Sequence, residues 1–233
     1  MVGAMNNEPA RPPKAELQAS ADVVLLTIED DRLKVVLVER TKEPDKGSLA
    51  LPGGFMWAGE DAVTTARRVL AAKAGVTGDV YMEQLYTFSE PGRDSRGHIL
   101  SVSYMALVRR EDLVFAEGPL TETPALYPAV GHPKLSFDHD RILKYGLKRM
   151  RDKLLYTNIA YALLPMHFTL TQLQRVYEIV LGRDLDKRNF RKKYLSLDMI
   201  RPVEAAMRGG RHRPAQMYEF VYAKPVELAE PAL

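Results

Sequence analysis

The stretch LPGGFMWAGEDAVTTARRVLAAKAGV, residues 51–76, decides the fold of the first half of the chain. It begins with a Pro-Gly-Gly turn after a short apolar run, which is typical of a chain reversal at the end of a strand. A loop extends from this turn to Gly59 and Glu60, and the residues that follow have the pattern of a helix. Glycine is common where helices end, so Gly75 marks the end of this one. The stretch predicts a strand, a turn, a loop and a helix in succession.

This stretch resembles a Nudix box, the signature motif of the Nudix family. The family pattern is Gly, five residues, Glu, seven residues, and then Arg-Glu-apolar-x-Glu-Glu-x-Gly-apolar. Six positions match it in register, namely Gly54, Glu60, Arg68, Leu70, Gly75 and Val76. The three remaining glutamate positions hold Val69, Ala72 and Lys73. The alternative is an ordinary amphipathic helix after a glycine turn, and the matches in register favour a degenerate Nudix box.

Residues 69, 72 and 73 share one face of the expected helix, because positions i, i+3 and i+4 are neighbours on a helix surface. Three carboxylates there would form an oxygen-rich patch able to hold Mg²⁺ against a diphosphate. A β-branched apolar group, a methyl group and an ammonium group take their place. Glu60, even with Asp61 beside it, offers too few oxygen ligands for a hard cation. We therefore expect no metal site, no cofactor and no Nudix hydrolysis.

The composition is that of an ordinary globular protein with one large or two modest domains. The chain has 233 residues, of which 46% are apolar and 27% are charged. No apolar run approaches the roughly 18 residues that suggest a membrane span, and the N-terminus lacks the apolar region of a signal peptide. Zero cysteines exclude disulfides, thiolate catalysis and cysteine-ligated zinc. We expect a cytoplasmic protein with no membrane partner, whose residues 1–18 form a flexible tail.

Strand patterns flank the box on both sides. Residues 23–28 and 33–38 are β-branched runs around an acidic turn, so they predict a hairpin. Residues 81–88 and 99–108 are also strand-like and are separated by a polar loop. The resemblance implies that residues 19–153 fold as a Nudix-like α/β/α sandwich with a mixed sheet.

A helical period begins after Phe137 and Asp138, which have the residue types of a hydrophobic staple and an N-cap. Its apolar stripe consists of Ile142, Leu143, Leu147, Met150 and Leu154. No second His or Cys stands at ligand spacing from His139, so we expect an interface or capping role for it rather than metal ligation. This helix is expected to close the first domain.

The polar loop SEPGRDSRGH, residues 89–98, resembles the substrate-side loop of Nudix proteins that handle ADP-ribose. Arg93 and Arg96 can each fork onto a phosphate or ribose oxygen. Phe88 is a candidate for stacking on a base, with a core position as its alternative, and Arg40 is a candidate anion contact, with a solvated surface arginine as its alternative. The predicted ligand-binding set is Arg40, Gly54, Glu60, Arg68, Phe88, Arg93 and Arg96.

The second half of the chain has the pattern of a winged helix. Thr169 and Gln172 form a capping box for one helix, and a short turn after Gly182 leads to a second helix that Asp184 or Asp186 caps. Residues 209–210 supply the turn of a following hairpin, whose tip is basic. We expect residues 154–226 to form a winged helix-turn-helix domain and residues 227–233 to form a C-terminal tail.

Positive charge gathers in this part of the chain. Ten Lys or Arg and four acidic residues lie between positions 183 and 213, a balance of +6 against +3 for the whole chain. Such a local basic patch is typical of phosphate-backbone binding, and a solvated basic helix is its alternative. Phe190 and Tyr194 are four residues apart and are expected to pack inward. The predicted DNA contacts are Thr169, Thr171, Gln172, Lys187, Arg188, Asn189, Arg191, Lys192, Arg211 and Arg213.

A Nudix-like domain followed by LDKRNFRKK (residues 185–193) and GGRHRPAQMYEF (residues 209–220) resembles the Nudix-related transcriptional regulators of NAD metabolism, the NrtR family. The resemblance covers nearly the whole chain after the tail. It implies a homodimeric repressor that binds double-stranded operator DNA and controls NAD synthesis genes. It also implies that the Nudix domain senses ADP-ribose or a related nucleotide as a small-molecule effector.

Two other functions are compatible with the residues. A Nudix hydrolase acting on ADP-ribose would need its metal site rebuilt from Asp61, Glu83 or Glu90. A pseudoenzyme whose basic domain binds RNA is the third possibility, and the lack of an aromatic-rich sheet motif or a KH-type loop argues against it. We therefore expect a non-enzymatic, DNA-binding regulator.

Overall fold

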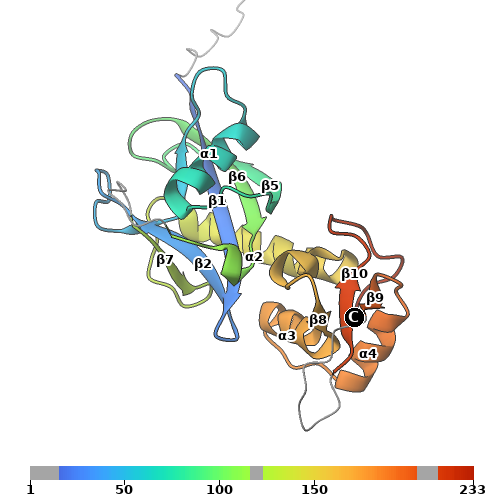
Figure 1. Ribbon diagram of the computed structural model, residues 1–233. Coiled ribbons are helices and arrows are strands. Elements are labelled where there is room, and N and C mark those ends of the chain that lie inside the picture. Colours follow the sequence, from blue (N-terminus) through green and yellow to red (C-terminus); the bar gives the residue numbers. More distant parts are fainter. Residues whose placement is uncertain (1–15, 116–122, 204–214) are drawn as a thin grey trace, which may run out of the picture.

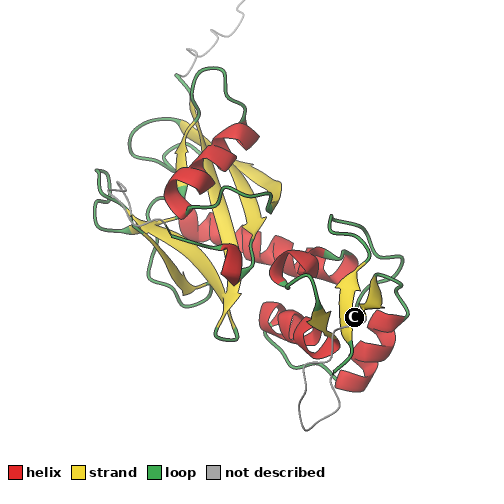
Figure 2. Cartoon of the chain, viewed as in Figure 1, coloured by secondary structure: helices red, strands yellow, loops and turns green. Residues whose placement is uncertain are grey.

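The structure is a computed structural model that describes residues 16–115, 123–203 and 215–233. It has two lobes joined by one long helix, α2 (His139–Tyr156), as Figure 1 shows. The first lobe is a large sheet with helices on its two faces, and the second is a cluster of helices beside a small sheet (Figure 2). The predicted hairpin turn at residues 209–210 and its basic tip at residues 211–213 lie outside the described residues.

The first lobe is built on a seven-stranded sheet in the order β3-β2-β1-β6-β5, with β4 paired to β1 and β7 paired to β2. β1 and β6 run parallel, and the other paired strands run antiparallel. The expected mixed sheet is therefore confirmed. Its strands are β1 (Gln18–Glu29), β2 (Arg32–Glu39), β3 (Leu49–Ala50), β4 (Gly53–Phe55), β5 (Tyr81–Phe88), β6 (Ile99–Leu107) and β7 (Pro124–Pro128).

Alternate residues of β1 point to opposite faces of the sheet, as the two-residue period of a strand requires. Val23 and Leu25 belong to the core cluster that includes Leu70 of α1 (Ala62–Ala74). Val24 and its even-numbered neighbours belong to the cluster that includes the buried stripe of α2. A methyl group added at Gly146 would lie 3.0 Å from Val24 Cγ1, so α2 packs closely on this face. The expected α/β/α sandwich is confirmed.

The second lobe contains η2 (Ile159–Leu163), β8 (Phe168–Thr169), α3 (Leu170–Leu181), α4 (Lys187–Leu195), β9 (Ile200–Val203) and β10 (Met217–Phe220). The three strands form a sheet in the order β8-β10-β9. Thr169 and Gln172 make the expected capping box at α3, Gly182 ends α3 in the left-handed conformation, and the Asp186 side chain caps α4. The winged helix-turn-helix architecture is confirmed.

The two lobes are in contact along α2 and α3. Arg151 Nε of α2 donates to the Val180 carbonyl of α3 over 3.0 Å. At the β1–β2 turn, Arg175 Nε of α3 donates to Asp31 Oδ1 over 3.2 Å. The remaining short helix, η1 (Arg110–Asp112), follows β6 in the first lobe.

Residues 227–233 were expected to be a tail, and the structure corrects this. Ala232 is fully buried, and its N–H donates to the Leu155 carbonyl over 2.7 Å. Leu228 N–H donates to the Tyr156 carbonyl over 2.8 Å, and Glu230 pairs with Lys193 of α4. The last carbonyls of a helix lack partners within the helix, so this segment satisfies two of them at the end of α2. The expected N-terminal tail also ends earlier than residue 18, because β1 already includes Gln18.

Asp138 occupies the N-cap position of α2, but its carboxylate makes no capping hydrogen bond. Its two oxygens accept from Arg93 instead, over 3.0 and 2.6 Å. A bidentate arginine is a stronger partner for a carboxylate than a single backbone N–H, so the ion pair takes the side chain away from the helix end.

No helix in the described part of the chain is long and apolar enough to cross a membrane.

Candidate ligand cavity and nucleic-acid interface

A cavity of about 210 Å³ opens in the first lobe beside the Pro-Gly-Gly turn. It is bounded by β1, β2, β4, the end of α1, the 89–98 loop and the start of α2, and it is mostly polar. The side chains and backbone that line it belong to Ser20, Asp22, Val38, Arg40, Lys42, Glu43, Ala50, Leu51, Gly53, Gly54, Phe55, Lys73, Arg93, Asp94, Arg96, Phe137 and His139. Of the predicted ligand-binding set, Arg40, Gly54, Arg93 and Arg96 therefore lie at one cavity.

The two glycines of the turn bring the backbone close to its neighbours at the cavity floor. A Cβ atom on Gly53 would lie 1.8 Å from Asp22 Oδ1, which no side chain can tolerate. A Cβ atom on Gly54 would lie 3.2 Å from Val69 Cγ2 of α1. The turn therefore lies against β1 on one side and α1 on the other, which shapes the cavity.

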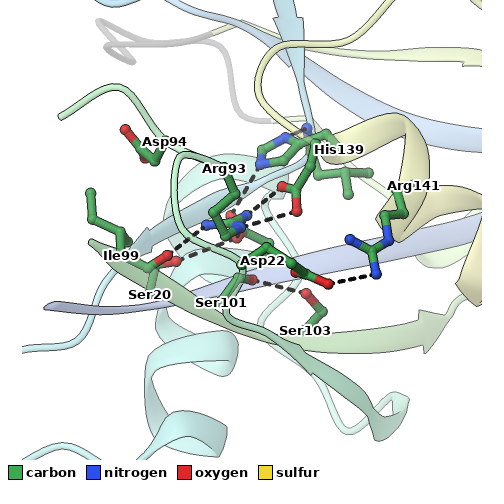
Figure 3. A network of polar contacts seen from close by, with 12 residues as sticks. Ser20, Asp22, Arg93, Asp94, Ile99, Ser101, Ser103, His139 and Arg141 are labelled. Carbon is green, nitrogen blue, oxygen red and sulfur yellow. Dashed lines mark hydrogen bonds and ion pairs between the residues drawn. The ribbon is translucent and has the colours of Figure 1, made fainter. Parts of the chain in front are cut away.

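Arg93 is the centre of a buried polar network (Figure 3), with only 4% of its side chain exposed. It holds Asp138 through two hydrogen bonds and donates to the Ile99 carbonyl over 3.3 Å. Its Nη2 also lies 3.9 Å from Asp22 Oδ2. The Arg93 guanidinium is thus occupied by protein groups, and it fixes the start of α2 against β1 and the 89–98 loop.

His139 lies in the same network and is buried. The Leu51 N–H donates to its Nδ1 over 3.0 Å, so the proton of the neutral ring is carried by Nε2, which lies 3.7 Å from Asp22 Oδ1. Burial lowers the pKa of His139 despite the nearby carboxylates of Asp22 and Asp138. The ring serves as a neutral acceptor for the backbone of the Pro-Gly-Gly turn, and it belongs to no group of possible metal ligands within the described part of the chain.

Arg40 and Arg96 both lie over the ring of Phe137, with guanidinium-to-centroid distances of 4.6 and 5.2 Å. Arg40 donates to the carbonyls of Pro44 and Lys42 and to no described carboxylate. Arg96 is held by Asp94 through bonds of 2.9 and 2.6 Å and also lies 4.9 Å from the Phe55 ring centre. Stacking on an aromatic face fixes the direction of a guanidinium without neutralising its charge.

Glu60 and Arg68, two members of the predicted ligand set, do not line the cavity. They form a bidentate pair over 2.8 Å, and Glu60 also accepts from Thr65 Oγ1 and the Trp57 N–H. The hydrogen bonds from Arg68 lower the pKa of Glu60 to about 2. Arg68 stacks on Trp57 at 3.6 Å. The two matched residues of the box hold the loop that precedes α1.

Phe88 does not lie at the cavity either. Its side chain is 1% exposed, and it packs on Tyr86 and Tyr145 at ring distances of 5.3 and 6.0 Å. Arg141 covers its ring at 5.4 Å. Burial in the core leaves no free ring face for a base, so the core alternative replaces the stacking prediction.

The residues of the box do not fit a divalent cation. Val69 is buried against Gly54, Ala72 has no ligand atom, and Lys73 brings a positive charge to the cavity wall. No group of three His, Cys, Asp or Glu in the described ranges is placed to hold a metal ion. The fold implies a cation at this point, and the side chains present do not supply its ligands.

The three carboxylates that could rebuild a metal site are engaged elsewhere. Asp61 caps α1 by accepting from the Thr64 N–H over 2.8 Å. Glu83 pairs with Arg149 and Lys153, and Glu90 pairs with Arg141 over 2.7 Å. None of the three lines the cavity.

In the second lobe, α4 presents a basic face to solvent. Phe190 and Tyr194 are buried as expected, at 2% and 0% exposure. The predicted contact residues of this helix are all exposed: Lys187, Arg188, Asn189, Arg191 and Lys192. Among the described residues, the four cations of this set make no ion pair. An exposed row of unneutralised cations is suited to a phosphate backbone.

The crossing of α3 and α4 is fixed by aromatic side chains. Tyr177 of α3 lies 5.3 Å from Phe190 and 5.7 Å from Tyr194, ring centre to ring centre. Burial raises the pKa of Tyr194 to about 12, so its hydroxyl stays neutral beside the Tyr177 hydroxyl at 3.3 Å. This packing orients the exposed face of α4.

The other predicted DNA contacts are placed as follows. Thr171 and Gln172 are exposed at the start of α3, and Thr169 is partly buried in the capping box. Arg211 and Arg213 lie outside the described residues. The predicted contact face that the structure describes is therefore the basic face of α4 together with the polar first turn of α3.

Comparisons with known proteins bear on both lobes. Residues 17–123 match the NUDIX domain family, and residues 160–220 match the family described as the NrtR DNA-binding winged helix domain. The chain is 32% identical over 207 residues to the ADPR responsive transcriptional repressor NtrR of Acinetobacter baylyi, covering 86% of this chain and 81% of that protein. The chain belongs to the NrtR family.

Crystal structures of NrtR from Shewanella oneidensis are similar to this one. The complex of that protein with a 27mer DNA has 32% sequence identity and a TM-score of 0.73, covering 87% of this chain and 93% of the other. The NUDIX domain of the same NrtR, complexed with ADP ribose, has 33% identity and a TM-score of 0.52, covering 61% of this chain and 94% of the other. The likeness extends over both lobes.

A further relative is an enzyme. The ADP-ribose pyrophosphatase of Methanocaldococcus jannaschii is 34% identical over 117 residues, which are 50% of this chain and 67% of that protein. About half of this chain thus resembles a hydrolase. The winged helix at residues 160–220 matches a separate family, the NrtR DNA-binding winged helix domain.

Sequence reasoning missed several residues that build the cavity. Asp22 lies within an apolar strand and was not singled out, although a carboxylate in such a run needs a buried partner. Phe137 was predicted only as a staple residue, and the sequence did not indicate that its ring would contact Arg40 and Arg96 at the cavity. Trp57 gave no signal, because its partner Arg68 is eleven residues away across a loop.

Proposed function

We propose that this chain is a transcriptional repressor that binds double-stranded operator DNA through α4 and responds to ADP-ribose or a related nucleotide. The observation that carries the proposal is the exposed basic face of α4, in a winged helix of the NrtR type: its Lys187, Arg188, Arg191 and Lys192 form no ion pair with any residue that the structure describes. The likeness over both lobes to an NrtR complexed with DNA supports it. The family resemblance makes genes of NAD synthesis the expected targets.

Within the exposed face of α4, we propose that some residues contact base edges and others contact phosphates. Arginine or lysine can pair with guanine edges and asparagine with adenine, while the remaining cations hold phosphates. Arg188 and Asn189 are consecutive exposed residues in the first turn of α4, and we propose them as the base contacts. Lys187, Arg191 and Lys192 are the proposed phosphate contacts.

The first lobe is the proposed sensor. Its cavity carries Arg40 and Arg96 in fixed directions over Phe137, an arrangement suited to the two phosphates of a nucleoside diphosphate derivative. The complex of the Shewanella domain with ADP ribose supports this ligand class. Ligand can release DNA only if it binds the two states of the protein with different affinity.

We also propose that the working species is a homodimer, with the first lobe contributing to its contact. Two recognition helices are needed to read paired half-sites about one helical turn apart. Sedimentation of the full chain alone and with operator DNA measures this directly. A single monomer bound to each operator would contradict the dimer.

The test of the proposed function is binding of the purified full chain to its own upstream DNA, with a scrambled duplex as control. Fluorescence anisotropy at moderate salt is expected to show selective binding, and added ADP-ribose is expected to lower it. Equal binding to both duplexes would contradict the proposal that this chain is a sequence-specific repressor. Selective binding that does not change when ADP-ribose is added would contradict only the proposal that ADP-ribose is the effector.

Hydrolysis is the second candidate, because half of the chain resembles a pyrophosphatase. We propose that it does not occur, since Val69, Ala72 and Lys73 supply no metal ligands. Incubation with ADP-ribose and Mg²⁺ is therefore expected to release no AMP above the rate without protein. Sustained AMP release would reverse this assignment.

A further inference from the structure

The cavity lies beside the degenerate Nudix box, whose metal-ligand positions at Val69, Ala72 and Lys73 hold no carboxylate. Each position that would hold a cation is filled: Val69 packs on Gly54, Ala72 offers a methyl group, and Glu60 is fully engaged with Arg68 and its neighbours. A nucleoside diphosphate carries negative charge, which a Nudix fold would otherwise balance with a divalent cation. Without that cation, cationic side chains of the protein must balance the diphosphate, and Arg40 and Arg96 alone leave the α1 side of the cavity without positive charge.

Lys73 lies where a Nudix fold would hold its divalent cation. It belongs to the last turn of α1, at a position where the family pattern has a metal-binding glutamate, and it is one of the residues that line the cavity. The cavity lining contains five cationic side chains against three carboxylates: Arg40, Lys42, Lys73, Arg93 and Arg96 against Asp22, Glu43 and Asp94. Such a lining repels a free divalent cation and attracts an anion.

The arginines of the lining are not equally available. Arg93 is buried in its ion pair with Asp138, whereas Arg96 pairs with Asp94 and keeps 38% of its side chain exposed. Arg40 donates to two backbone carbonyls and to no carboxylate in the described ranges, so no ion pair offsets its positive charge there. Lys73 lines the cavity from α1 and Arg40 lines it from the end of β2, so the two place positive charge on different walls.

We propose that the ammonium group of Lys73, at the degenerate box position on the cavity wall, takes the place of the divalent cation, so that the cavity binds a nucleoside diphosphate without metal. The ammonium is a compact charge with three donors, which suits the phosphate oxygens that a metal would otherwise contact. The inference rests on the proposed function, because it assumes that an ADP-ribose-like ligand enters this cavity.

Lys73 has a second role that the test must separate from the first. A cation in the last turn of a helix is favoured by the helix dipole, so Lys73 also stabilises α1. A purely structural lysine would change thermal stability without changing the metal dependence or the affinity of ligand binding.

The first measurement uses the unaltered full chain. Isothermal titration with ADP-ribose is run in EDTA and again in Mg²⁺, and the two dissociation constants are expected to agree within about twofold. Binding that requires Mg²⁺ would overturn the metal-free site and leave the proposed sensor intact. Binding in neither buffer would overturn both proposals.

The second measurement tests whether Lys73 supplies the positive charge that contacts the diphosphate. In EDTA, Lys73→Met is expected to weaken ADP-ribose binding by about tenfold or more, the size of a lost hydrogen bond to a charged group. Lys73→Arg, which keeps the charge, is expected to lose less. Lys144→Met, at an exposed lysine of α2 away from the cavity, removes the same charge as a control and is expected to bind normally. Normal binding by Lys73→Met would overturn the proposal.

Discussion

At Gly53 the chain passes so close to Asp22 that an added methyl group would lie 1.8 Å from its carboxylate oxygen. We expect Gly53→Ala to lower the free energy of unfolding by about 2 kcal/mol or more, because Asp22 is buried and cannot move aside freely. Gly78→Ala, at a position with open space around it, is the matched control and is expected to be nearly neutral. Urea unfolding of both variants checks this, and equal stability of the two would contradict the close approach.

The buried His139 makes stability depend on pH. Burial lowers its pKa below the ordinary value of 6.5, so the unfolded state binds a proton more readily than the folded state. Its contribution to stability is therefore complete above about pH 6.5 and is lost as the pH falls below that value. The charged groups around the ring are Asp22, Asp138, Arg93 and Arg40.

The corresponding variant is His139→Asn, whose side-chain oxygen can accept from the Leu51 N–H in place of Nδ1. We expect thermal unfolding between about pH 6.5 and 5 to show a steeper loss of stability for the unaltered chain than for the variant. Parallel curves for the two proteins would show that another group causes the loss.

Individual contacts were the least predictable level of the structure. The sequence showed that Arg93 and Arg96 lie in a polar loop, and both lie at the cavity. It did not show that Arg93 is buried, because its partner Asp138 is 45 residues away in sequence. A side chain's partner is a property of the folded arrangement, whereas its position in a turn or helix is set locally.

At the scale of elements, α4 presents the residues that the proposed DNA contact needs. Arg188→Ala is expected to weaken specific operator binding by about 1–3 kcal/mol if the side chain reads a base, or to lower the salt slope by about 1 if it holds a phosphate. Lys224→Ala, at an exposed lysine of the same lobe, is the control. Binding titrations at several salt concentrations check this, and unchanged affinity and slope would remove Arg188 from the interface.

The elements themselves were largely predictable. The capping box at Thr169, the glycine after α3 and the Asp186 cap are signals within a few residues, and each forms as expected. Phe190 and Tyr194 could be assigned to the core from their spacing alone. The N-cap at Asp138 failed for the opposite reason, since a distant arginine competes for the carboxylate.

At the scale of the whole molecule, residues 227–233 tie the end of α2 to α4. Removing them leaves two helix carbonyls without their partners and takes the buried Ala232 out of the hydrophobic core. We expect this truncation to lower the melting temperature by about 2–4 °C for each kcal/mol lost. Removing Leu233 alone, which is 42% exposed, is the control. A melting temperature unchanged by the longer truncation would contradict the packing.

The course of this last segment could not be predicted, because its partners are backbone carbonyls far away in sequence and carry no side-chain signal. The order of the two lobes was predictable, because each has its own local motif. The extents of the domains, 19–153 and 154–226, stay predictions, and the family matches cover 17–123 and 160–220.

The long helix α2 has its first residue, His139, in the cavity wall and its last residues in contact with the C-terminal segment of the second lobe. Its 18 residues span about 27 Å. It can therefore act as a lever arm, since a tilt of about 5° at the cavity would displace its far end by about 2 Å.

Because the chain has no cysteine, single spin labels can be attached at the exposed Val63 of α1 and Leu195 of α4 after substitution by cysteine. A change in the distance between the labels on adding ADP-ribose is expected, and an unchanged distance would contradict the lever. In a dimer of such chains the two displacements would add. A movement of each helix end that is shorter than the rise of one base pair would then decide whether both copies of α4 can reach their half-sites at the same time.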